Sequence, residues 1–128
     1  MTDTISDMLT RIRNGGCALL PTVNIPHSRL KESIANIMVK EGYLAEAKVA
    51  GEAKKTITVR LKYQGKRHVI AGLRRVSRPG LRHYVGSDAV PRVRGGLGVS
   101  ILSTSEGVMT GATARRKHLG GELICFVW

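Results

Sequence analysis

The chain has 128 residues, 42% of them hydrophobic, and a formal net charge of +12. This length suffices for one compact domain or two small ones, and the hydrophobic content excludes wholesale disorder. The longest apolar run, residues 123–128, is far too short to cross a bilayer. The start of the chain is acidic where a secretory or organellar leader is basic, so we expect the protein to stay where it is made.

The basic residues are concentrated in the middle of the chain. Residues 1–53 hold six basic and six acidic side chains. Residues 54–94 hold twelve basic side chains and a single acidic one, Asp88, whereas residues 95–128 hold three basic and two acidic side chains. Such a concentrated positive charge favours a polyanionic partner through counterion release, and nucleic acid is the leading class. An anionic membrane competes as an interpretation, but it usually selects a basic amphipathic helix, whereas residues 54–94 alternate like strands.

Hydrophobic spacing predicts the order α-β-α-β-β for residues 1–66. Thr4 can cap a first helix, which Gly15–Gly16 would end or loosen. A short strand over residues 22–25 follows. The apolar stripe of the first helix has the i, i+3, i+4, i+7 spacing and consists of Ile5, Met8, Leu9 and Ile12.

A second helix and a hairpin complete this half. Ser28 can cap the helix and Gly42 can close it. Residues 43–49 and 56–63 alternate as two antiparallel strands, with helices expected on one side and water on the other. The inward positions expected on the second helix are Leu30, Ile34, Ile37 and Met38.

The remaining residues, 67–128, predict mostly antiparallel strands with one short helix. Proline at position 79 and glycine at position 80, which accepts positive φ, predict a tight turn. Thr110 can cap a helix over residues 111–118, and the last strand is apolar on both faces, so we expect it to be covered. The chain is therefore predicted to be α+β, with an N-terminal α/β half (1–66) and a C-terminal β-rich half (67–128). The strands expected in the second half are residues 68–73, 81–85, 89–93, one ending at 104, and 122–128.

Three hydroxyls, Ser103, Thr104 and Ser105, stand at the end of a predicted strand, and Gly107 then lets the backbone turn. Hydroxyls both donate and accept, which suits base edges, ribose hydroxyls and phosphate oxygens alike. A solvent-exposed Ser/Thr turn has the same sequence, so both interpretations stand.

The residues that could carry catalysis or bind a metal are scattered. The four histidines occur singly, and neither a GxSxG motif nor a paired-carboxylate arrangement is present. Residues 95–98 lack both GxGxxG and a P-loop lysine. Cys17 and Cys125 have no CxxC or zinc-finger spacing, and we expect both to be reduced core residues. No catalytic residue, metal or cofactor is expected.

Four segments together resemble the bacterial-type small-subunit ribosomal protein eight family, in the family's order and across nearly the whole chain. Glu106 is a departure, since the family usually carries Lys or Arg at this position. The sequence therefore does not support a basic contact at the tip. The segments are 5–14 (ISDMLTRIRN), 76–82 (VSRPGLR), 96–110 (GLGVSILSTSEGVMT) and 120–128 (GGELICFVW).

The resemblance implies a non-catalytic structural component of the small ribosomal subunit, located in the cytoplasm, that binds the central domain of small-subunit rRNA and helps its assembly. It implies a monomer before assembly, contact with neighbouring small-subunit ribosomal proteins, and no membrane. Repression of the protein's own messenger rests on the resemblance alone. The expected RNA-binding residues are Ser103, Thr104, Ser105, Gly107, Glu122, Arg78, Arg82, Tyr84, Arg92, Arg115 and Arg116.

A basic DNA-binding or chromatin-like protein is the alternative. It would need a basic recognition helix or a dimer seam, whereas both clear amphipathic helices lie in the neutral first 53 residues. Tyr84 is the one stacking candidate in the basic segment, and it could equally be a packed side chain.

Overall fold

The computed structural model describes residues 3–128. The chain divides into two compact units, an N-terminal unit of residues 5–71 and a C-terminal unit of residues 72–128 that also takes in residues 3–4. Helices and antiparallel sheets occur in both, which confirms the α+β class. Whether residues 1–66 and 67–128 are independent domains stays a prediction.

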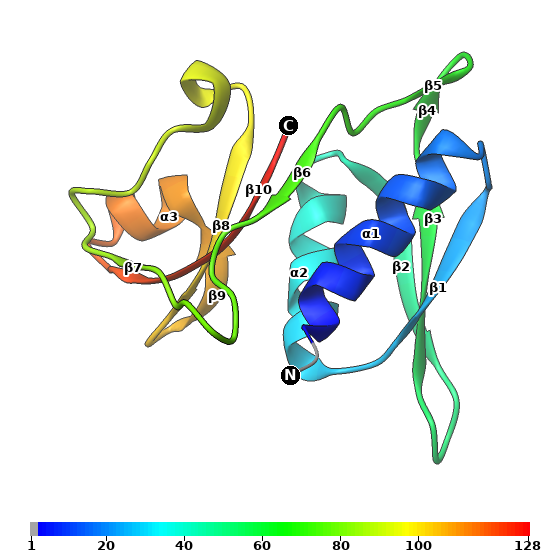
Figure 1. The fold of residues 1–128 in the computed structure, drawn as a ribbon, viewed down its shortest axis with the longest axis horizontal. Coiled ribbons are helices and arrows are strands. Elements are labelled where there is room, and N and C mark those ends of the chain that lie inside the picture. The colour runs from blue at the N-terminus through cyan, green and yellow to red at the C-terminus, as the bar shows by residue number, and fades with distance from the viewer. Residues whose placement is uncertain (1–2) are drawn as a thin grey trace. The chain divides into compact units, whose positions relative to one another are not determined.

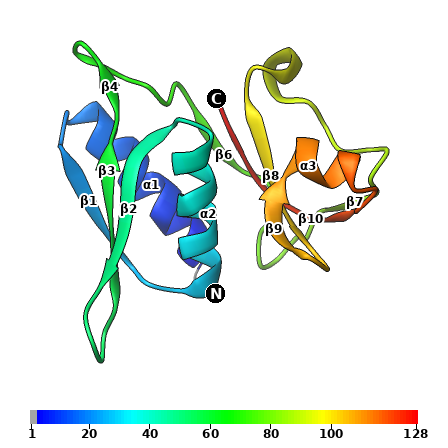
Figure 2. The same ribbon diagram turned by 180° about the vertical axis from the view of Figure 1, so that it is seen from behind.

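The N-terminal unit is a three-stranded antiparallel sheet with two helices on one face (Figure 1). The strand order is β1-β3-β2, with β1 at Thr22–Pro26, β2 at Leu44–Ala50 and β3 at Thr56–Leu61. Figure 2 shows the same sheet from its other side. Helices α1 (Thr4–Cys17) and α2 (Arg29–Lys40) bury their apolar stripes, and a small hairpin of β4 (Tyr63–Gln64) and β5 (Arg67–His68) follows the sheet.

Most of the elements predicted for this unit are present, including the cap of α2, where the Ser28 hydroxyl accepts a hydrogen bond from the Lys31 backbone N–H. Ile34 and Met38 are buried as expected, but Leu30 and Ile37 are only half-buried, and Lys31 is buried instead. The inward face of α2 is thus rotated slightly from the one that hydrophobicity alone predicts.

Three expectations for this unit were wrong. Helix α1 continues through Gly15–Gly16 to Cys17. The glycines allow close packing instead, since a Cβ at position 16 would lie 2.0 Å from Nδ1 of His68. Cys17, the last residue of α1, is exposed and not in the core, although both cysteines are free thiols. Residues 68–73 do not form one strand, since β5 ends at His68 and the chain leaves the unit before the next strand begins at Leu73.

The C-terminal unit is a sheet with the order β6-β10-β8-β9, in which β7 also pairs with β10. The central strands are β8 (Val99–Thr104) and β10 (Gly121–Val127). The shorter strands are β6 (Leu73–Arg75), β7 (Tyr84–Val85) and β9 (Gly107–Thr110). A 3-10 turn at Val93–Gly96 precedes β8, and helix α3 (Gly111–Arg116) follows β9.

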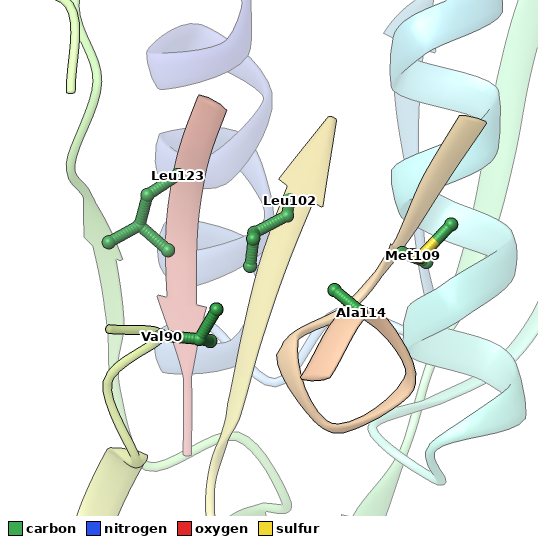
Figure 3. Packing of buried hydrophobic residues seen from close by; sticks show 5 residues of the cluster. All are labelled: Val90, Leu102, Met109, Ala114 and Leu123. Carbon is green, nitrogen blue, oxygen red and sulfur yellow. The ribbon is translucent and has the colours of Figure 1, made fainter. Parts of the chain in front are cut away.

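The core of this unit lies on one face of the sheet, where Leu102, Leu123 and Met109 stand side by side in the strand register. Ala114 of α3 and Val90 pack against them (Figure 3). Side chains of successive strand residues point to opposite faces, so the residues that follow Leu102 and precede Leu123 belong to the other face.

The turn at Pro79–Gly80 is confirmed by reciprocal backbone hydrogen bonds between Arg78 and Leu81, but Gly80 does not have a positive φ. Thr110 caps α3, and β10 is covered, both as predicted. The strand expected at 81–85 is shortened to Tyr84–Val85.

The strand predicted over residues 89–93 is wrong. Val90 is buried in the core, but it reaches the core from a stretch without regular structure. The next residue, Pro91, has no N–H to contribute to a ladder.

Candidate nucleic-acid interface

Three of the predicted site residues form one row across the C-terminal sheet. Glu122 of β10 is the direct register partner of Ser103 on β8 and, on its other side, of Tyr84 on β7. Directly opposite residues of antiparallel strands project from the same face, so the three side chains share the face that Leu102 and Leu123 do not use. Tyr84 is 70% exposed. The row therefore combines a hydroxyl, a carboxylate and an open aromatic ring.

The hairpin tip between β8 and β9 carries the hydroxyls. Thr104 pairs with Gly107, which leaves a two-residue loop of Ser105 and Glu106, and Gly107 has φ +114°, a conformation that favours glycine. The Thr104 hydroxyl donates to the Gly107 carbonyl at 2.8 Å and accepts from the Glu106 N–H at 3.2 Å. It therefore stabilises the turn.

The two serine hydroxyls of the tip differ from that of Thr104. Within residues 3–128, neither the half-buried Ser103 nor the exposed Ser105 uses its hydroxyl in a hydrogen bond. Both hydroxyls can therefore bond to a ligand without breaking a contact in the protein.

Glu122 is held as a carboxylate by two donors. Its Oε2 accepts from the Ser77 hydroxyl at 2.5 Å and from Nη1 of Arg82 at 2.9 Å. Burial alone would raise the pKa of Glu122, but these two hydrogen bonds, with the positive charges of Arg82 and Arg75, more than offset it and hold the pKa below its ordinary value. The group is therefore ionised, and able only to accept, at neutral pH.

The basic residues predicted for the site are not equivalent. The predicted cations that lie exposed on this unit are Arg78, Arg82, Arg92 and Arg116. Arg115 is half-buried and donates to the backbone carbonyl of Val90, so it also holds α3 against the core.

The basic segment of residues 54–94 is shared between the two units. Six of its twelve cations precede Ala71 and six follow Gly72. One of the latter, Arg75, is buried and binds Asp3 and the Ile124 carbonyl. The positive field therefore does not belong to the C-terminal unit alone.

Two residues that the sequence did not indicate contact side chains of the candidate site or its tip. Ser77, which is fully buried, holds Glu122. Lys117 has its Nζ 3.8 Å from Oε1 of Glu106, so it partly neutralises the acid at the tip. No local pattern indicates either contact, because the partners are 45 and 11 positions apart in the sequence.

Among the described residues, no three His, Cys, Asp or Glu side chains lie close enough to hold a metal ion. Burial raises the pKa of the Cys125 thiol to about 12, which makes it a poor nucleophile. No helix in residues 3–128 is long and apolar enough to span a membrane.

A small, strongly basic α+β chain with such a polar sheet face is typical of a nucleic-acid-binding protein. The family model described as Ribosomal protein S8 matches residues 3–128. The chain belongs to the ribosomal protein S8 family, which is a structural family and not an enzyme family, and the resemblance carried by the four sequence segments is confirmed.

The chain also aligns with named relatives over nearly their full length. The chain is 55% identical to a protein of Mesoplasma florum over 127 residues, covering 99% of this chain and 98% of that one. It is 52% identical to a protein of Spiroplasma kunkelii, covering 100% and 99%, and 54% identical to one of Nitrosococcus oceani, covering 99% and 98%. All three relatives are named small ribosomal subunit protein uS8.

Proposed function

We propose that the chain is a structural, non-catalytic component of the small ribosomal subunit, which binds the central domain of small-subunit rRNA directly and helps it to assemble. The observation that carries the proposal is the row of Ser103, Glu122 and Tyr84, which adjoins the hairpin tip bearing the Ser105 hydroxyl. Family membership supports the ribosomal setting.

The row has the chemistry that reading an RNA minor groove requires. The major groove of A-form RNA is too deep and narrow for side chains to read, whereas its wide, shallow minor groove displays 2′-hydroxyls and base edges. Serine hydroxyls beside Gly107 approach such a surface without bulk, and each can donate or accept. Glu122 accepts only, so it pairs with 2′-hydroxyl or amino donors and repels phosphate. Tyr84 offers a ring on which a splayed base can stack.

The exposed cations supply attraction that does not depend on sequence. Arg78, Arg82, Arg92 and Arg116 would contact phosphates and fix the register of the protein on the RNA. Affinity then divides into a salt-dependent part from these cations and a specific part from the hydroxyl and carboxylate groups.

In this setting the protein is a cytoplasmic monomer until it joins the assembling subunit, where it lies beside other small-subunit ribosomal proteins. An rRNA-like fold in its own messenger would present the same minor-groove surface. The protein would therefore bind that messenger through the same residues and repress its translation.

A competition experiment separates this function from that of a DNA-binding or chromatin-like protein. A labelled fragment of the rRNA central domain is bound at physiological salt and challenged with unlabelled fragment, unrelated structured RNA or duplex DNA. We expect the unlabelled fragment to compete at far lower concentration than the other two. Equal competition by duplex DNA would contradict the proposal, and so would a failure of the protein to cosediment with small subunits.

A further inference from the structure

The hydroxyl of Ser77 is buried and hydrogen-bonded to Glu122, a member of the proposed RNA-reading row. Ser77 has 0% of its surface exposed, so it cannot touch a bound RNA. A buried hydroxyl is unfavourable unless it is hydrogen-bonded, and this one makes two bonds. It donates to Oε2 of Glu122 at 2.5 Å and accepts from the His83 backbone N–H at 3.2 Å.

Of the two groups that hold Glu122, Ser77 is the fixed one. Its backbone N–H donates to the Leu123 carbonyl at 3.0 Å, so Ser77 is anchored to the same strand that carries Glu122. Arg82 is long and its side chain is 47% exposed. An exposed ion pair is weak, so the guanidinium of Arg82 can leave for a phosphate, whereas Ser77 stays.

Both protein donors bind the same carboxylate oxygen. Within residues 3–128, Oε1 of Glu122 accepts no hydrogen bond, while Oε2 accepts two. Because the Ser77 hydroxyl holds Oε2, the carboxylate rotates less freely, and the lone pairs of Oε1 stay available for a ligand. A preset acceptor loses less conformational entropy on binding than one that must first be ordered.

We propose that Ser77 is a positioning residue for RNA recognition, which holds the Glu122 carboxylate so that its Oε1 meets a hydrogen-bond donor of the RNA. This inference rests on the proposed function, because it assumes that Glu122 contacts RNA. Ser77 acts entirely through Glu122 and contributes neither charge nor direct contact.

A double-mutant cycle tests this role. Dissociation constants for a central-domain rRNA fragment and for an unrelated structured RNA are measured with the wild-type chain, Ser77→Ala, Glu122→Ala and the double variant. Without Ser77 the Glu122 side chain must be ordered when the RNA binds, so Ser77→Ala should weaken binding of the cognate fragment by about two- to tenfold. Binding of the unrelated RNA should not change. In the Glu122→Ala background, the added Ser77→Ala should change cognate affinity by less than about twofold.

A second readout concerns the carboxylate itself. Glu122 is titrated in the free protein by carboxyl-carbon NMR, and its pKa should rise in Ser77→Ala because a donor to the charged form is lost. An unchanged pKa would show that the Ser77 hydroxyl does not hold the carboxylate in solution, and it would overturn the inference. Should Ser77→Ala fail to fold, Ser77→Cys keeps nearly the same volume with a much weaker donor and takes its place in the cycle.

Failure of the role of Ser77 and failure of RNA recognition by Glu122 give different results in this cycle. If Glu122→Ala binds the cognate fragment like the wild type, the proposed readout by Glu122 is wrong and the role of Ser77 is overturned with it. If Glu122→Ala weakens binding but Ser77→Ala does not, or if its effect is equally large in both backgrounds, only the inference about Ser77 is overturned.

Discussion

The ion pair between Asp3 and Arg75 predicts that the start of the chain stabilises the C-terminal unit. Nε of Arg75 lies 3.0 Å from Oδ2 of Asp3, and the side chains are only 8% and 18% exposed. In Asp3→Ala, the buried guanidinium of Arg75 would keep its hydrogen bond to the Ile124 carbonyl but lose its carboxylate partner. Breaking a buried pair by removing one partner costs about 3–5 kcal/mol. Because Asp3 retains some exposure, we expect about 3 kcal/mol of lost unfolding free energy, the lower end of that range.

The assay is urea unfolding followed by the fluorescence of Trp128, the only tryptophan of the chain, whose backbone pairs with Gly72 in the C-terminal unit. Glu106→Ala is the matched control, because its pair with Lys117 belongs to the same unit but is exposed. That variant should lose at most about 1 kcal/mol. A loss for Asp3→Ala no larger than the control would refute the reasoning.

The same pair bears on the predicted domain boundary. A fragment of residues 67–128 lacks Asp3, so it should unfold at lower urea than the full chain. Replacing Arg75 by Met in that fragment should restore part of the stability, because an apolar side chain of similar volume does not need a carboxylate.

Three further predictions concern the packing of a glycine, the reactivity of the two thiols and the proposed phosphate contact of Arg82. Gly16→Ala should destabilise the N-terminal unit by about 1–3 kcal/mol, measured by urea unfolding with circular dichroism, because the new Cβ would meet the His68 ring; no measurable loss would contradict this packing. In thiol labelling at pH 8, exposed Cys17 should react and Cys125, with a pKa of about 12, should react only after unfolding; two fast-reacting thiols in the native protein would contradict its burial. Arg82→Ala should lower the slope of log affinity against log salt by about 0.7 to 1, and an unchanged slope would show that Arg82 does not contact phosphate.

The elements that sequence predicted well are those with strong local signals. Helices α1 and α2 have apolar residues at helical spacing, and Ser28 and Thr110 are side chains whose hydroxyls cap the helix that follows. The hairpin tip was predictable because a glycine, Gly107, follows a strand that ends in hydroxyl residues, and in the structure Gly107 does take a positive φ.

The wrongly predicted elements depend on the path of the chain in the folded structure. Residues 68–73 and 89–93 contain apolar residues at strand-like spacing, and Ile70 and Val90 are indeed buried. Both side chains belong to stretches without regular structure, and Ile70 lies where the chain passes from one unit to the next. Periodicity cannot distinguish such a buried side chain from one in a strand. Gly15–Gly16 misled for a similar reason, since a glycine needed for close packing looks like one that ends a helix.

The candidate site was predicted in part. The sequence indicates Ser103, Tyr84 and Glu122 one by one, but their alignment in one row depends on the pairing of three strands distant in sequence. Ser77 and the local use of the Thr104 hydroxyl required the folded structure. Hydrogen bonds between residues far apart in the chain leave no pattern in one sequence.

If the tip hydroxyls read RNA, the affinity of Ser105→Ala for the central-domain fragment shows it most directly. An unpaired RNA group would cost about 1 to 3 kcal/mol, so cognate binding should weaken by roughly five- to a hundredfold. The fold, the salt slope and the affinity for unrelated RNA should stay as in the wild type, because no charge is removed. If Ser103→Ala, Thr104→Ala and Ser105→Ala all bind the cognate fragment like the wild type, the tip is an ordinary turn and the assignment of this surface is wrong.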